Sequence, residues 1–433
     1  MRKNIALLAI GVLLIVGTAS AQETTGSIIG TITSQDGATL PGVTVTISDE
    51  ETGFQRVTVA NAGGEYKFVA LQPGRYGLMA ALDGFQTYQR DIDIGLGRTV
   101  KNDFVMTIGA ITDVIEVTGE APLVDVTSTV SGLTVNTGQL ASSTPLGRDA
   151  TQIALLAPGT VSGDTAFNDA SFGYTPGQNL NSMGGASVAE NQMQVNGLNI
   201  SNFRNGLGGS FVPFEFVEEL QVKTGGYEAE YGRATGGVVN MVTKSGTNSF
   251  HGNVSAYFRP ESLQEQEPNT YLAWNQDETT EDNEYNASIG GPIVKDHLFF
   301  FAFVRYWDRN RLGLLNTTGT RFEVAQPYYG GKVDWNITNN HRLEATYITD
   351  EVETDTLDYD YDKDTGTLTP GFTGVQQRGG QNIIGKYTGI FAENFLISGQ
   401  YGTNDFDRTN ASEGDPCPCL LYTSDAADDL LQV

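Results

Sequence analysis

The sequence predicts a chain dominated by β-structure with three successive parts: an N-terminal β-sandwich, an α+β domain, and the first strands of an antiparallel transmembrane β-barrel. Three observations predict this class. The chain contains 52 glycines and 10% aromatic residues, a composition that suits strands and turns. Short alternating runs separated by turn signals fill the first hundred residues. Beyond residue 248 the alternation continues over longer, paired segments, which is typical of an outer-membrane barrel.

Composition limits the possible functions. The 433 residues include 25 Lys+Arg against 52 Asp+Glu, a net charge of −27 that disfavours binding to nucleic acid. The two cysteines, Cys417 and Cys419, lack the second ligand pair that a zinc site needs. The three histidines lie beside expected strand ends or turns. We therefore expect no enzyme, no catalytic residues, no cofactor and no metal site.

The first 21 residues read as a signal peptide. Arg2 and Lys3 precede an apolar run of about twelve residues, and Ala19-Ser20-Ala21 forms a small-residue cleavage site. The run is shorter than the roughly twenty residues that a membrane-spanning helix needs. We expect export through a bacterial inner membrane, and a membrane-embedded form would have to be a β-barrel.

Residues 26–109 form the predicted sandwich. Turn signals at Asp36-Gly37, Pro41-Gly42, Gly63-Gly64 and Pro73-Gly74 separate short strands. The segment resembles the carboxypeptidase regulatory-like domain; the matching positions are Gly30-Thr31-Ile32, Pro41-Gly42-Val43-Thr44-Val45, Gly64-Glu65-Tyr66-Lys67-Phe68 and residues 71–76. Because it contains no histidine, we expect no peptidase activity. Its role is open between docking or spacing and the binding of a glycan or peptide.

Residues 216–246, FVEELQVKTGGYEAEYGRATGGVVNMVTKSG, contain a predicted half-buried strand, two glycine pairs and a second apolar strand. This stretch resembles the end of the plug domain of TonB-dependent outer-membrane receptors, and residues 127–246 would form the plug. The turn Gln192-Met-Gln-Val-Asn-Gly-Leu-Asn-Ile200 fits the same domain, with Asn196 where most relatives carry Asp. Asn-Gly favours a two-residue hairpin. The plug motif comprises Asn196, Gly197, Tyr231, Gly232, Gly236, Gly237, Asn240, Thr243 and Lys244.

A short amphipathic helix is predicted over residues 151–158, entered after Pro145 and ended before Pro158. Its pattern resembles an element of Oar-like receptors. Loops at residues 160–185 and 201–213 should point outward, where Arg204 and Asn205 are candidate ligand contacts. Ordinary solvated loop residues are the alternative.

Residues 110–126 form a linker with a short extended segment. An isolated strand of this kind can add to the edge of a partner's sheet through main-chain hydrogen bonds. The segment resembles the TonB box, which would make TonB and its inner-membrane motor the partners; a first plug strand explains the same residues. The candidate TonB-binding residues are Asp113, Val114, Ile115, Glu116, Val117 and Thr118.

Residues 247–415 are predicted to form part of the barrel. The clearest hairpin covers residues 332–347 around Asn339-Asn340, with apolar side chains facing lipid and polar ones facing the lumen. Residues 285–306 and 382–401 form two further pairs. Short turns are expected in the periplasm, and long acidic connections, such as residues 261–284 and 350–364, outside.

Only about seven barrel strands are visible, whereas members of the resembling family have 22. We interpret the sequence as a fragment. Residues 416–433 resemble translated sequencing-adapter read-through, and we treat them as a probable sequencing artefact.

The resemblance implies an outer-membrane receptor of a Gram-negative bacterium that imports an extracellular solute with energy delivered by TonB. An Oar-like barrel that serves adhesion or protein export is the alternative. A soluble carbohydrate-binding β protein is a third, which the lipid-facing alternation disfavours.

Overall fold

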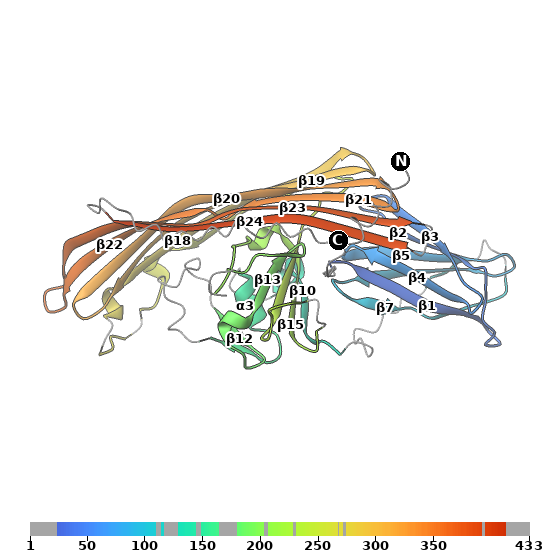
Figure 1. The fold of residues 1–433 in the computed structure, drawn as a ribbon, viewed down its shortest axis with the longest axis horizontal. Coiled ribbons are helices and arrows are strands. Elements are labelled where there is room, and N and C mark those ends of the chain that lie inside the picture. The colour runs from blue at the N-terminus through green and yellow to red at the C-terminus, as the bar shows by residue number, and fades with distance from the viewer. Residues whose placement is uncertain are drawn as a thin grey trace, which may run out of the picture.

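The computed structural model describes residues 24–109, 114–116, 129–143, 149–163, 180–202, 207–227, 231–266, 268–271, 274–391 and 395–412. The predicted signal peptide and residues 416–433, with both cysteines, lie outside these ranges. Three parts are visible: a blue sandwich, a green plug and a curved wall of long yellow to red strands (Figure 1).

The N-terminal part is a sandwich of two sheets, as predicted. One sheet has β4-β1-β7, with β8 also pairing with β1, and the other has the order β3-β2-β5-β6-β9. Apolar residues at alternate positions, such as Ile28, Ile32, Val45 and Ile47, are fully buried between them. The strands are β1 (Gly26–Ser34), β2 (Thr44–Asp49), β3 (Phe54–Val59), β4 (Glu65–Leu71), β5 (Gly74–Ala81), β6 (Thr87–Ile94), β7 (Thr99–Lys101), β8 (Phe104–Met106) and β9 (Val114–Glu116).

The plug is a five-stranded mixed sheet in the order β10-β15-β16-β13-β14, with short helices. The predicted helix is present as α3 (Ala150–Ala154), capped by Asp149, whose carboxylate accepts from Thr151 N at 2.9 Å. The sequence analysis did not predict α2 (Thr137–Ser143). The remaining elements are β10 (Ser131–Asn136), β11 (Thr160–Ser162), β12 (Asn181–Met183), η3 (Val188–Glu190), β13 (Gln192–Val195), β14 (Leu198–Asn199), η4 (Phe214–Phe216), β15 (Val217–Gly225) and β16 (Val238–Thr243).

The wall is an eight-stranded antiparallel sheet within the described ranges. All three predicted hairpins are present. Lys332 and Asp334 are buried, whereas Val333 and Trp335 are 40% and 47% exposed, which confirms the predicted alternation. Its elements are β17 (His251–Arg259), η5 (Glu261–Leu263), η6 (Asn275–Asp277), β18 (Thr279–Val294), β19 (Leu298–Leu314), β20 (Thr318–Thr338), β21 (His341–Thr349), β22 (Val352–Asp362), β23 (Thr367–Phe391) and β24 (Phe395–Ser412).

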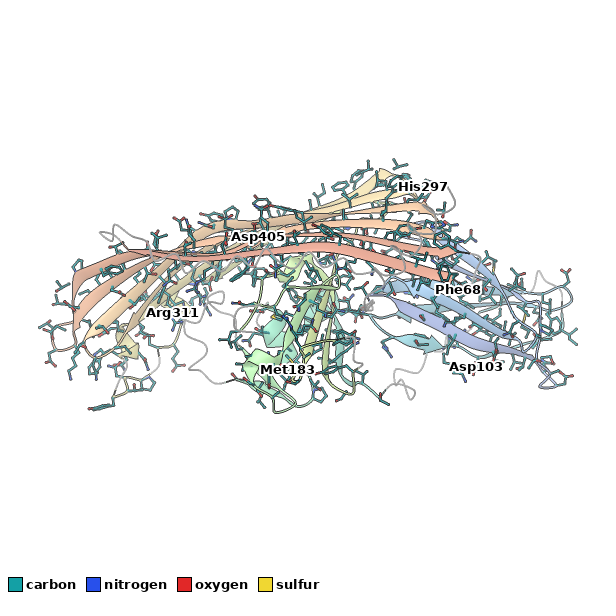
Figure 2. All side chains as sticks on the ribbon, viewed as in Figure 1. Phe68, Asp103, Met183, His297, Arg311 and Asp405 are labelled. Atoms are coloured by element: carbon teal, nitrogen blue, oxygen red, sulfur yellow. The ribbon has the colours of Figure 1, made fainter. Side chains whose placement is uncertain are left out.

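The sandwich lies at one end of the wall, and the plug lies against the wall's concave side (Figure 1). His297, in the short turn between β18 and β19, lies toward the sandwich end, whereas Arg311 lies toward the opposite end (Figure 2). The turns at residues 295–297 and 339–340 therefore lie at the sandwich end. The connections at the opposite end, residues 315–317 and 363–366, are equally short, because most of the acidic segment 350–364, expected as a long connection, is strand β22. Among the described residues no helix has the length and apolarity to cross a bilayer.

Candidate functional site: the plug and its contacts

The Asn196-Gly197 turn joins the plug to the wall. Both residues have positive φ, 48° and 87°, and they close the predicted two-residue hairpin between β13 and β14. The Asn196 amide donates to the hydroxyls of Thr243 (2.8 Å) and Thr346 (3.0 Å), and its oxygen accepts from Thr243 N (3.0 Å). Because Thr346 belongs to β21, the turn anchors β16 and the hairpin to the wall.

The glycine pair Gly236-Gly237 is required by close packing. A Cβ at Gly236 would collide with the Asn191 amide oxygen, and one at Gly237 would collide with the Met183 sulfur. Gly237 N also donates to Asn191 Oδ1 at 3.0 Å. These glycines let the chain pass tightly over β12 and η3 before β16 begins.

The other motif residues are mainly structural. Lys223 Nζ donates to the hydroxyl of Tyr231 at 2.6 Å, and both side chains are buried. No neighbour lies within contact distance of a Cβ placed at Gly232. Asn240 is fully buried in β16, and Lys244 N donates to Phe216 O at 2.8 Å. The motif therefore holds the sheet together at its centre.

The sequence analysis was wrong about one face of β15. It predicted a half-buried strand, but Glu219, Gln221 and Lys223 are only 7–8% exposed, like the apolar residues between them. The Thr134 side chain of β10 and the Leu96 backbone of the sandwich contact this polar face. The two consecutive glutamates at 218 and 219 interrupt the alternation of apolar and polar residues, and this interruption could have indicated that both faces of β15 are buried. The register of β15 against β16 shifts at this point.

An aromatic contact attaches the plug to the wall. Phe216 is fully buried and stacks on Phe303 of β19 with ring centroids 4.3 Å apart; Phe301 lies at 5.8 Å. Ile348 and Ile384 of the wall belong to the same core cluster. Burial of such rings is a large, non-directional source of stability.

A buried charge cluster on the wall continues this attachment; it consists of Lys332, Asp334, Arg342 and Glu344. Lys332 lies 3.2 Å from Glu344 and 3.5 Å from Asp334, and Arg342 lies 2.6 Å from Asp334. Lys332 Nζ also donates to the Ser245 hydroxyl at the end of the plug (3.1 Å). The cluster thus pairs its own charges and holds the plug's last residues.

Farther from the short turns, the plug meets the wall again at Phe211. Phe211 N donates to Asp350 Oδ2 at 2.7 Å, and the Arg305 guanidinium lies 4.8 Å from the Phe211 ring. The candidate ligand contacts Arg204 and Asn205 lie outside the described residues. The ends of their loop meet, since Asn202 N donates to Gly208 O at 3.0 Å.

The candidate TonB-binding segment lies on the sandwich. Val114, Ile115 and Glu116 form β9, which pairs in parallel with β6 in the register Thr87↔Val114 to Gln89↔Glu116. β9 is the last strand of its sheet. The extended conformation is as predicted in these three residues, whereas Asp113, Val117 and Thr118 lie outside the described ranges.

A sandwich loop grips the plug, a contact that the sequence analysis missed. Leu96 N donates to Glu219 Oε2 at 2.7 Å, and Gln221 Nε2 donates to Leu96 O at 2.8 Å. We call this pair of hydrogen bonds the clasp. Burial raises the pKa of Glu219 to about 7, although the bond from Leu96 N acts to lower it.

The part of the chain that the structure describes contains no group of three or more His, Cys, Asp or Glu side chains arranged to hold a metal. What this site can do is mechanical: it holds a folded sheet against the inner face of a barrel wall.

Two family models match the chain: the carboxypeptidase regulatory-like domain over residues 27–107 and the outer membrane beta barrel domain over residues 242–326. The TonB-dependent transporter Oar of Myxococcus xanthus is 34% identical over 73% of this chain. The match covers 30% of that protein, so the chain spans about a third of its length.

Two further comparisons cover smaller parts or show lower identity. The probable TonB-dependent siderophore receptor PirA of Acinetobacter baumannii is 29% identical over 31% of this chain and 17% of its own length. The solved outer membrane transporter YddB of Escherichia coli aligns over 65% of this chain and 39% of its own, with 11% identity and a TM-score of 0.48.

Proposed function

We propose that this chain, which is similar to the Oar-like TonB-dependent transporters of the outer membrane, imports an extracellular solute with energy from TonB. The plug carries this proposal. It is a folded sheet held on the concave side of the wall at Asn196, Phe216 and Ser245. A plug in this place must be remodelled before a bound solute can pass.

We place the end of the wall that contacts the sandwich, with its turns at residues 295–297 and 339–340, in the periplasm. The long strands β20 and β23 and the acidic strand β22 between them then extend outward beyond the plug toward the cell exterior. Arg204 and Asn205, in the loop closed by Asn202 and Gly208, are our candidate ligand contacts.

TonB would bind at β9. This strand has β6 on one side and is the terminal strand of its sheet, so a strand of TonB can add along the other side through main-chain hydrogen bonds. The neighbouring Asp113, Val117 and Thr118 would lengthen the contact. TonB's inner-membrane motor would then supply the pull.

Proline and alanine at residue 115 test this docking mode. Strand addition depends on backbone groups, so Ile115→Pro should abolish retention of the purified periplasmic domain of TonB by the receptor, while Ile115→Ala should retain most of it. Equal retention by both variants would rule out strand addition at β9.

Transport is separated from the adhesion or export alternative by the phenotype of a deletion strain. We expect deletion to abolish growth on at least one sole nutrient source, with attachment and protease secretion unchanged. Loss of attachment or secretion with normal growth on every source would favour the alternative. Sequencing the source DNA downstream of residue 410 should reveal the further alternating strands that a closed barrel requires.

A further inference from the structure

The sandwich has no assigned role in the transport proposal, but its contacts with the wall and the plug indicate one. The sandwich contacts the segment that enters the wall and two of the wall's short turns. Asn248 N, just before β17, donates to Glu51 O at 2.7 Å, and Arg56 Nη2 donates to Asn339 O at 3.3 Å. Gly53 lies against Asp296, where a Cβ would collide with the carboxylate. The sandwich is therefore seated on the rim of the wall.

A second row of contacts lies inside this rim. Gln72 Nε2 donates to Glu344 of the charge cluster at 3.0 Å, and Lys386 of β23 donates to the Thr24 hydroxyl. Asn196 of the plug lines the same cavity of about 20 Å³ as Thr24, Gln72, Glu344 and Lys386. Sandwich, plug and wall thus meet at one point.

The loop that forms the clasp is shaped for its partner. Arg98 N donates to Gly95 O and Gly97 N donates to Thr25 O, both at 3.2 Å, so the loop is a fixed turn. A Cβ at Gly95 would lie 3.0 Å from Glu219 Oε1, and one at Gly97, where φ is +62°, would lie 3.2 Å from Gln221 Nε2. Both backbone groups of the fully buried Leu96 are used on β15. Larger side chains on either side would separate the surfaces.

The clasp acts on the strand that supports the plug's edge. Gln221 and Glu219 of β15 stand opposite Thr134 and Asn136 of β10, the first strand of the sheet. Gln221 Nε2 also lies 3.3 Å from Thr134 Oγ1, so one amide joins the sandwich, β15 and β10. The backbone of Leu96 therefore contacts β15 directly and β10 through Gln221.

We propose that the N-terminal sandwich is a plug-retaining clasp: it is fixed to the rim of the barrel and holds β15 through Leu96, so that the plug is released only after the sandwich undocks. The role is independent of which solute is carried and of where TonB binds.

The test is amide hydrogen exchange of the receptor in outer membranes, comparing wild type with Glu219→Ala/Gln221→Ala. We expect peptides 94–98 and 131–136 to exchange about tenfold faster or more in the variant, because two buried hydrogen bonds are lost, while β1 peptides stay unchanged. Glu218→Ala is the matched control: Glu218 contacts Asn136 and not the sandwich, so peptide 94–98 should keep its protection.

A cross-link between the sandwich loop and β15 provides a second test if the alanine variant misfolds. In a receptor without other cysteines, the pair Gly95→Cys and Glu219→Cys is joined by a short, reducible thiol cross-linker. We expect the cross-linked receptor to regain slow exchange of peptide 131–136 and to lose it on reduction. Failure to cross-link, or exchange of β10 that is unaffected by the cross-link, would overturn the proposal.

Discussion

The plug is held on two sides by different chemistry. On the wall side it has stacked rings at Phe216 and Phe303, and its last residues reach the buried charge cluster. On the sandwich side the clasp consists of two hydrogen bonds to the backbone of Leu96. Water can replace hydrogen bonds as surfaces part, whereas separating buried rings or charges from their partners costs much more. The comparison predicts that the sandwich side opens first.

Lys332→Ala should produce the largest effect, on the wall side. It leaves Asp334 and Glu344 buried with Arg342 as their remaining cluster cation, and it removes the partner of Ser245. We expect a loss of about 3–5 kcal/mol in the free energy of unfolding, measured by urea titration in lipid vesicles.

Arg259→Ala is the control for this charge. Arg259 also pairs with a carboxylate, Asp282, but its side chain is 53% exposed. Its loss should cost less than about 1 kcal/mol. An equal loss of free energy of unfolding in the two variants would show that burial does not make the ion pairs of the charge cluster stronger than the exposed Arg259–Asp282 pair.

Asn196→Ala should have an intermediate effect. It removes three buried hydrogen bonds between hairpin, β16 and wall, and it places alanine at φ +48°. The expected cost is about 1–3 kcal/mol, with faster hydrogen exchange of β13 and β14. Asn196→Asp keeps the acceptor for Thr243 N and should lose less; a loss equal to that of alanine would contradict the role of this acceptor.

The smallest expected effect is the pH dependence of the sandwich side. The pKa of Glu219 is raised from 4.5 to about 7, mainly by burial; Glu218 also acts to raise it, and the Leu96 N–H and Arg98 act to lower it. The docked state thus favours the protonated carboxyl. Its contribution is fully present below pH 4.5 and is lost as the pH rises through about 7.

Between pH 5 and pH 8 we expect undocking of the sandwich to become about tenfold more favourable or more. The measurement is amide hydrogen exchange of peptide 94–98, corrected for the intrinsic pH dependence of exchange, which reports how often the sandwich undocks. Glu219→Gln should remove this pH dependence, and a profile that persists in Glu219→Gln would assign it to another group.

The local elements were predictable from the sequence. Asn196-Gly197 could be assigned to a turn because both residues tolerate positive φ, and the hairpin at Asn339-Asn340 followed from strict alternation on either side. Gly236 and Gly237 were recognisable from the motif, although their reason, the nearby Asn191 and Met183, appears only in three dimensions.

The contacts between parts were not predictable. The clasp uses the backbone of Leu96, which carries no sequence signal, and its partner Glu219 is more than a hundred residues away. Lys332 reads from its position as an ordinary lumen-facing residue, and its contact with Ser245 depends on how plug and wall meet. Likewise, nothing in Val114–Glu116 indicates that β6 is its neighbour.

The pairing of β9 with β6 sets the order in which force and movement reach the plug. β9 is attached to the sandwich and β10 to the plug, and the chain between Glu116 and Ser131 can extend to about 50 Å at most. A pull applied at β9 therefore moves the sandwich first. Through this linker β10 receives tension only when the two strands have separated by that full length. In the proposed mechanism the first load of the pull is therefore borne by the contacts of the sandwich with the rim and with β15, and not by the linker.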